Sequence, residues 1–443
     1  MNPPVRLMSL LVGGLVWAGA SVAQHVSVPT APPMALSSVP SVPIQGVNHL
    51  AWHGVAHKLR RLKIAQVDGH QVAPVRILHI GDSHTSGDYF SDATRRALQA
   101  EYGDAGPGWL PAGLPKWGRS ALVQISASEH WKHRYAYIDK TPPFSLGGAA
   151  YETQRPWATL SYTLKNPPLN ATPAVSWRLW FRQTPPPEAL HLYADDVPVM
   201  LSHAPQEGAS GAASRFMHET VLPQLPSKLG MVTTQAQSVE LVGMSLDLHT
   251  PGVVYDSMGV AGARAASLLT SWGTDVTAQV LRVRPPDLVI LAFGTNEAYQ
   301  ATFNADAYRS ELMAVHQWLQ TYTPDAAVLL IAPPDALERL GRCPANARTQ
   351  CWPASSPASA CGVRSHPNLP VVRQTMQDFA QSRSWGYWDW SQVMGRSCGA
   401  WQWQRETPPR YRPDGIHLTS EGYETSGLAL FKALRTLEQQ IGR

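Results

Sequence analysis

Residues suited to ester chemistry lie near the two ends of the 443-residue chain. Ser83 follows Gly81 and Asp82, between a β-prone run at 75–80 and a segment at 92–100 that predicts a helix. A strand followed at once by a turn and a helix lifts the serine hydroxyl from the sheet edge, close to backbone N–H groups. Serine is a weak nucleophile, so this position predicts a base elsewhere in the chain.

That base is predicted in the sequence Asp-Gly-Ile-His near the C-terminus, where Asp414 and His417 are three positions apart. One short loop or helical turn can present both side chains. Asp414 could orient one imidazole nitrogen of His417 while the other accepts the proton of Ser83. The alternative interpretation is a polar loop in front of a helix over 427–437.

Two further positions could supply donors for a developing oxyanion. Asn296 follows the apolar run 287–293, a predicted buried strand, at the strand end where ligands bind in open α/β sheets. Its side-chain amide can donate to an oxyanion, although Asn also caps helix N-termini well. Gly262 could offer a backbone N–H at a turn, or simply satisfy a turn that needs positive φ.

Four blocks in this order resemble the SGNH (GDSL-type) hydrolase superfamily: residues 81–83, 259–262, 294–296 and 414–417. The resemblance covers most of the chain from residue 75 onward, apart from one insertion. It implies Ser83 as nucleophile, His417 as general base and Asp414 as the residue that orients it. It also implies an oxyanion hole made by the Ser83 and Gly262 N–H groups and the Asn296 side chain. No metal or organic cofactor is expected.

Three positions depart from the superfamily pattern. His84 stands where the first block usually has Leu, and Glu297 stands where the third block usually ends in Asp. The second block usually opens with Asn, but Ser257 and Met258 precede Gly259 here. None of these departures removes a catalytic atom.

A narrower resemblance rests on residues 81–84, 102–109, 387–390 and 394–395. These segments are similar to the periplasmic peptidoglycan O-acetylesterases of Gram-negative bacteria, which carry an inserted β-sandwich. The resemblance implies a serine esterase acting on an O-acylated extracytoplasmic polysaccharide, most directly peptidoglycan. A deacylase or acyltransferase acting on cellulose or another exopolysaccharide is one alternative. A non-catalytic glycan-binding assembly protein is the other.

Composition and the N-terminus favour an exported protein without a nucleic-acid partner. The net charge is only +4, and no block of like charges supports nucleic-acid binding. Arg6, the apolar run 7–20 and the small residues at 21–23 predict a signal peptide, with an uncleaved anchor as the alternative. Nothing later is apolar enough to span a bilayer. We therefore expect a periplasmic or secreted protein with no membrane span in the mature chain.

Cysteine usage agrees with export. The 4 cysteines, Cys343, Cys351, Cys361 and Cys398, predict two disulfides. Three pairings are possible, and Cys343–Cys351 with Cys361–Cys398 is the most local. A zinc site is the competing interpretation, but the spacings lack paired C-x-x-C units.

The expected architecture is an α/β, three-layer SGNH fold with a parallel sheet and an inserted all-β domain similar to carbohydrate-binding modules. We divide the chain into a signal peptide (1–23), a Pro-rich linker (24–46), a hydrolase domain (47–150 and 251–443) and a β-sandwich (151–250). Helices are predicted over 47–64, 261–272 and 305–319, and a further buried strand over 327–331.

Tryptophans are the main candidates for sugar contacts, since the chain has 16 of them. Trp109 is the first candidate for stacking on a sugar. Odd spacing places Trp177 and Trp180 on opposite strand faces, so at most one should be buried, whereas Trp388 and Trp390 share a face and should lie in the core. Arg264 could bind an acidic group, or be an exposed helix arginine.

Overall fold

The computed structural model describes residues 35–114, 118–139, 144–167, 170, 172–200, 216–270, 272, 275–341, 343, 350–357 and 361–441. The predicted signal peptide and the first part of the predicted linker lie outside these residues. No helix in the described part of the chain is long and apolar enough to cross a membrane.

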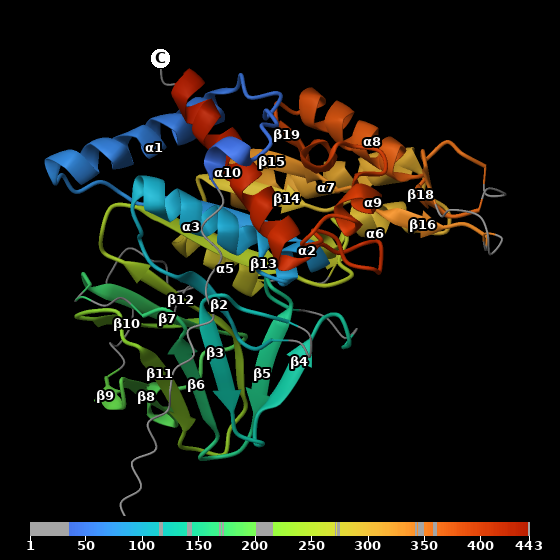
Figure 1. Ribbon diagram of the computed structural model, residues 1–443. Coiled ribbons are helices and arrows are strands. Elements are labelled where there is room, and N and C mark those ends of the chain that lie inside the picture. Colours follow the sequence, from blue (N-terminus) through green and yellow to red (C-terminus); the bar gives the residue numbers. More distant parts are fainter. Residues whose placement is uncertain are drawn as a thin grey trace, which may run out of the picture. The chain divides into compact units, whose positions relative to one another are not determined.

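A five-stranded, fully parallel sheet forms the centre of the fold, as expected for an α/β protein (Figure 1). Its order is β13-β1-β14-β15-β19. The strands are β1 (Val75–Gly81), β13 (Val253–Gly259), β14 (Leu288–Ala292), β15 (Ala327–Ala332) and β19 (Gly386–Asp389). One group of helices packs together against this sheet: α1 (Leu50–Asp68), α3 (Phe90–Tyr102) and α10 (Ser420–Ile441). A second group comprises α5 (Asp275–Val283), α7 (Ala305–Tyr322) and α8 (Leu369–Ser382).

Helices on both faces explain why these strands are almost continuously apolar. Every residue of β14 and of β15 is buried. Side chains of β1 alternate between the two faces. Leu78 and Ile80 join the core formed with α5, α7 and α8, while His79 meets Phe90 of α3 edge to face.

Two antiparallel sheets form a separate all-β region (Figure 1). The first has the order β10-β7-β12-β5-β4, with β2 paired to β12: β2 (Gly108–Pro111), β4 (Lys132–Tyr135), β5 (Ala149–Thr153), β7 (Val175–Phe181), β10 (Met217–Leu222) and β12 (Val239–Leu248). The second has the order β3-β6-β11-β8-β9: β3 (Val123–Ala127), β6 (Thr159–Leu164), β8 (Leu190–Ala194), β9 (Val197–Val199) and β11 (Lys228–Thr233). A 3-10 helix, η2 (Pro187–Ala189), precedes β8. The strands of this region therefore begin well before residue 151, and the predicted boundary falls within β5.

Both tryptophans of β7 are buried, which corrects the expectation that at most one would be. Trp177 is 1% exposed and packs between the two antiparallel sheets. Trp180 is 0% exposed and joins the other core, together with residues of the parallel sheet. The first antiparallel sheet is thus covered on both faces, which a single strand's pattern does not reveal. Trp388 and Trp390 are buried, as predicted.

The described end of the predicted linker packs onto the fold. After a 3-10 turn, η1 (Leu36–Ser38), Val39 and Val42 are buried. Gln45 exchanges two backbone hydrogen bonds with Tyr387 of β19, at 2.9 and 3.0 Å. Residues 39–45 are therefore an extended, docked segment, because their valines cover apolar surface beside the edge strand.

The predicted helix over 261–272 is wrong for most of its length. Residues 261–266 form a turn, and only α4 (Ser267–Thr270) is helical. Gly262, at φ +74°, takes the backbone out of the right-handed helical region at this point. Arg264 is consequently an exposed turn residue instead of a helix residue.

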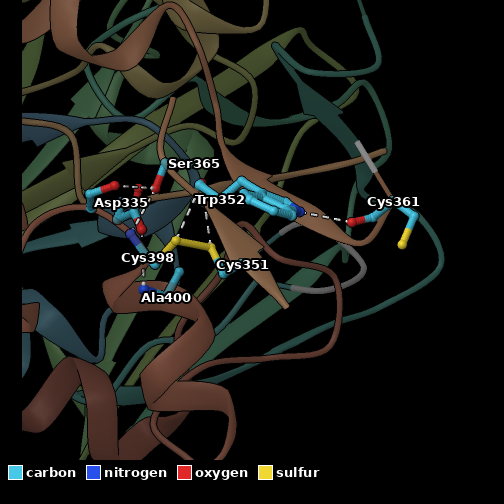
Figure 2. The surroundings of a disulfide bond; sticks show 8 residues. Asp335, Cys351, Trp352, Cys361, Ser365, Cys398 and Ala400 are labelled. Atoms are coloured by element: carbon cyan, nitrogen blue, oxygen red, sulfur yellow. Dashed lines mark hydrogen bonds between the residues drawn. A yellow bond between two sulfur atoms is a disulfide. The ribbon is translucent and has the colours of Figure 1, made fainter. Parts of the chain in front are cut away.

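Two disulfides are present, but with a less local pairing than the one we singled out. Cys343 bonds to Cys361, and Cys351 bonds to Cys398. They hold a small sheet of order β16-β18-β17: β16 (Leu337–Arg339), β17 (Cys351–Trp352) and β18 (Val363–Ser365). Between the two disulfides lies Trp352, whose Nε1 donates to the Cys361 carbonyl at 2.9 Å (Figure 2). Cys398 directly precedes α9 (Gly399–Gln404), and η3 (Trp390–Met394) lies upstream.

Candidate active site

The structure brings Ser83, His417 and Asp414 together from opposite ends of the chain. Ser83 Oγ lies 3.0 Å from His417 Nε2. The other ring nitrogen, Nδ1, lies 3.0 Å from Asp414 Oδ2. A neutral imidazole that donates from Nδ1 to the carboxylate leaves Nε2 as an acceptor for the serine proton.

Backbone geometry fixes Ser83 at the carboxyl end of β1. It is the first residue of a single helical turn, α2 (Ser83–Ser86), and Asp82 caps that turn by accepting the His84 N–H at 2.9 Å. A Cβ on Gly81 would lie 2.1 Å from Thr85 Oγ1 and 2.8 Å from the Ala292 carbonyl. Only glycine therefore allows the turn to fold back this tightly beside β14.

The loop that carries Asp414 and His417 organises its own carboxylate. Asp414 Oδ1 accepts the N–H groups of Ile416 and His417 at 2.8 and 2.9 Å. Partial burial opposes ionisation, but the His417 imidazole and these two N–H groups together lower the pKa of Asp414. The carboxylate thus stays charged opposite the imidazole.

Residues outside the loop hold it in place. Leu337 of β16 donates its N–H to the Gly415 carbonyl at 2.7 Å. Tyr411 OH lies within hydrogen-bonding distance of the Ile416 carbonyl (2.7 Å) and the Asp335 carbonyl (2.5 Å). The disulfide-bearing sheet and the segment after β15 therefore both support the acid–base loop.

Asn296 connects the serine turn to the loop that contains Gly262. It is the second residue of α6 (Thr295–Ala298), whose N-cap is Gly294, so it does not cap the helix. Its Nδ2 donates to the Ala263 carbonyl at 2.9 Å and to Asp82 Oδ2 at 3.4 Å. Asn296 therefore lies between the neighbour of Ser83 and the neighbour of Gly262.

Buried ionisable groups surround these residues, and sequence reasoning assigned them no role. Burial, helped by the nearby Glu297 charge, raises the pKa of Asp82 to about 8 against the opposing His84 N–H. Burial also raises the pKa of Glu297 to about 7, although its carboxylate accepts the Ala265 and Gly294 N–H groups at 2.8 and 2.9 Å. Glu297 thus fastens the start of α6 to the loop after β13.

His84 lies directly behind His417, with ring centroids 5.4 Å apart. Its Nδ1 is 2.9 Å from Tyr423 OH, at the start of α10. Burial, and then the charge of His417, lower the pKa of His84 to about 3. A neutral His84 can neighbour a protonated His417 without like-charge repulsion. The only hint in the sequence is that His84 replaces the usual Leu of the first block.

Trp109 is not placed to stack on a sugar, contrary to our expectation. It is 3% exposed and belongs to β2, which pairs with β12. Its ring lies on Gly243, where a Cβ would be only 2.2 Å from Cζ2. Trp109 therefore packs on the face of the first antiparallel sheet that joins the core of the parallel-sheet region. Arg264 is exposed in the turn after Gly262, where its N–H donates to Ser267 Oγ at 3.1 Å.

Within the described residues, no group of three or more His, Cys, Asp or Glu side chains is arranged to hold a metal ion. The described site offers a serine, an imidazole, a carboxylate and candidate oxyanion donors. Such a set can perform acyl transfer through a covalent intermediate.

Residues 232–425 match the model of the GDSL-like lipase/acylhydrolase family. The match includes Gly262, Asn296, Asp414 and His417, while Ser83 lies outside it. No curated protein sequence matches the chain.

A solved structure of a peptidoglycan O-acetylesterase superposes with a TM-score of 0.68 at 23% identity, covering 88% of this chain and 96% of that one. This likeness extends over both the parallel and the antiparallel sheets, and it establishes the fold. Two other matches are partial. A putative acylhydrolase from Bacteroides fragilis has a TM-score of 0.26 at 16% identity, covering 41% of this chain and 76% of that one. A family two carbohydrate esterase from Clostridium thermocellum has a TM-score of 0.29 at 8% identity, covering 72% and 99%.

Proposed function

We propose that this chain is an SGNH (GDSL-type) hydrolase and a serine esterase that removes O-acetyl groups from an extracytoplasmic polysaccharide, with peptidoglycan as the substrate. The observation that carries the proposal is the continuous contact from Ser83 Oγ through His417 to Asp414, at 3.0 Å for each step. Serine requires such a base to attack an ester at neutral pH.

In the proposed reaction, His417 Nε2 takes the Ser83 proton as Oγ attacks the acetyl carbonyl. Asp414 holds the imidazole in the correct tautomer and stabilises the imidazolium. The Ser83 and Gly262 N–H groups and the Asn296 amide would donate to the oxyanion. His417 then returns the proton to the leaving sugar oxygen, and water releases acetate from Ser83 by the reverse sequence of proton transfers.

The choice of substrate and compartment rests on separate observations. The solved structure with TM-score 0.68 is named for peptidoglycan O-acetyl ester hydrolysis. Two disulfides agree with a protein exposed to an oxidising compartment. The signal peptide expected over residues 1–23 would deliver the chain to the periplasm, where peptidoglycan is accessible.

The test is acetate release by the purified protein from O-acetylated peptidoglycan and, in parallel, from acetylated cellulose. Ser83→Ala should reduce release by several orders of magnitude. Ser86→Ala, a serine in the same short helix, should retain most of the activity. Acetate release from cellulose alone would identify an exopolysaccharide, and not peptidoglycan, as the substrate. Equal activity of Ser83→Ala and the unmodified protein would refute the mechanism. Acetate found on an added acceptor glycan would identify acyl transfer.

A further inference from the structure

The all-β region extends one aromatic side chain to the loop that contains Gly262. Tyr137 lies in the turn after β4 and is 49% exposed, a high value for an aromatic residue. A Cβ built on Gly262 would lie 3.1 Å from Tyr137 Cε2 and 3.2 Å from Cδ2. The tyrosine ring therefore rests directly against the glycine backbone.

Short contacts link this glycine to the serine. Ala263, the residue after Gly262, accepts the Asn296 amide at 2.9 Å. The same amide reaches Asp82 Oδ2 at 3.4 Å, one residue before Ser83. In addition, Gly259 of β13 stands in register with Gly81 of β1, which brings the two loops out at the same sheet end. Tyr137 is thus at the border of the proposed reaction centre.

An open pocket of about 160 Å³ lies at this place. Its wall combines Tyr137 and the apolar side chains of Phe144 and Trp272 with two polar groups, the Asp139 carboxylate and the Ser267 hydroxyl. Arg134 Nε donates to Asp139 Oδ2 at 2.8 Å and so fixes the carboxylate. The volume is below the roughly 300–1,000 Å³ of pockets that take drug-sized ligands, which suits a single sugar unit.

We propose that this pocket is a subsite for one sugar ring of the glycan, with Tyr137 as the surface on which the ring stacks and Asp139 as an acceptor for its hydroxyl groups. The proposal rests on the proposed glycan esterase function. An aromatic face covers the apolar C–H face of a pyranose, and a fixed carboxylate accepts from its O–H groups. The all-β region would then contribute directly to substrate choice, but through Tyr137 and not through Trp109.

Kinetics on two substrates separate this role from a structural one. Tyr137→Ala should lower kcat/KM for O-acetylated glycan by about two- to tenfold, mainly through KM, since an aromatic contact of this kind is modest. The loss of kcat/KM for p-nitrophenyl acetate should be smaller than the loss for the glycan, because that ester has no sugar to bind. Tyr137→Phe keeps the ring and should behave as the unmodified protein. Ile138→Ala is the matched control, since Ile138 is 74% exposed in the same turn and does not line the pocket.

Binding without turnover keeps this inference distinct from the esterase proposal. In a Ser83→Ala background, the hexamer of N-acetylglucosamine and cellohexaose are titrated by calorimetry, and the amino sugar is expected to bind more tightly. Adding Tyr137→Ala should weaken that binding two- to tenfold. Binding that depends on Tyr137, without acetate release by the active protein, would support the subsite and refute the esterase. No binding of either hexamer, or equal binding with and without Tyr137, would overturn the subsite.

Discussion

Arg284 offers the sharpest test of how the all-β region is attached to the parallel sheet. Its guanidinium is 1% exposed and contacts two carboxylates. It meets Asp247 of β12 at 2.9 and 3.0 Å, and Asp256 of β13 at 2.7 and 2.9 Å. Because β12 belongs to the antiparallel sheet and β13 to the parallel one, Arg284 joins the two regions through four buried hydrogen bonds.

The loss of stability expected for Arg284→Met depends on which hydrogen-bond partners the Asp247 and Asp256 carboxylates retain. Asp247 retains Arg76 Nη1 at 2.9 Å and Arg178 Nη1 at 2.7 Å. The described residues leave Asp256 with the backbone N–H of Trp109, at 2.8 Å. Breaking a buried pair costs about 3–5 kcal/mol. Among the described residues, Asp247 keeps two arginine partners and only Asp256 is left without one. The lower value, about 3 kcal/mol, is therefore expected. For a chain of 443 residues that corresponds to a fall in Tm of about 3 °C, at ~1 °C per kcal/mol.

Differential scanning calorimetry of matched variants decides whether this reasoning holds. Arg309→Met removes an exposed ion pair with Asp306 and should change Tm by less than about 1 °C. Arg284→Met combined with Asp256→Asn removes the uncompensated charge while keeping an acceptor for Trp109, so it should recover part of the loss. A fall below about 1 °C for Arg284→Met, or no recovery in the double variant, would refute the role given to Asp256.

Three further predictions concern the triad, pH and the disulfides. Asp414→Asn should lower kcat for acetate release by about 10⁴ with little change in Tm, because the tautomer of His417 is no longer fixed; a loss below tenfold would contradict this role. Raising the pH from 6.5 to 8 should lower the unfolding free energy by about 1–2 kcal/mol, because Asp82 and Glu297, with folded pKa values of about 8 and about 7, bind protons that the unfolded chain has already released. The buried His79 and His84, with pKa values lowered to about 3, act in the opposite direction below about pH 7.5 and offset part of this loss. Denaturant titrations across this range check the sign, and a constant or rising stability would contradict it. Replacing Cys351 and Cys398, 47 residues apart, by alanine should cost about 4 kcal/mol, against about 3 for Cys343 and Cys361, 18 apart; the reverse order in calorimetry would show that loop length does not govern the loss.

Local patterns predicted a parallel sheet, three of its five strands (β1, β14 and β15) and the side chains that meet at its edge. Buried strands alternate with helices, and each candidate residue follows a strand or a short turn. The carboxyl ends of parallel strands meet at one edge, so Ser83 after β1 and Asn296 after β14 come close together whatever lies between them in the sequence. The prediction for His417 did not depend on a strand, because the Asp-x-x-His segment forms a loop held by its own hydrogen bonds.

The wrong predictions for the tryptophans share one physical cause, which is burial by a partner surface that is remote in sequence. Trp177 and Trp180 lie on opposite faces of β7 as expected, but both faces of the first antiparallel sheet are covered, and Trp109 of β2 is buried on the same side as Trp180. The buried pair of Asp82 and Glu297 gave no local pattern either, since their raised pKa values arise from desolvation. Cysteine spacing favoured the local pairing, whereas the small sheet around β18 pairs Gly341 with Cys361 and so brings Cys343 close to Cys361.

The all-β region is attached to the parallel sheet at three places along the same edge strand. At the start of β13, the two ends of the all-β region lie side by side. The Leu248 N–H donates to the Ala105 carbonyl at 2.9 Å, and the Val253 N–H donates to the Gly103 carbonyl at 2.8 Å. In the middle of β13, Arg284 joins Asp256 to β12. Beyond its end, Tyr137 rests on Gly262. A region fixed at both ends and in the middle of one strand cannot swing as a lid. Its contribution to the reaction would therefore come from a preformed wall beside the Gly262 loop, and disrupting the Arg284 contacts should weaken glycan binding at Tyr137 without altering the triad.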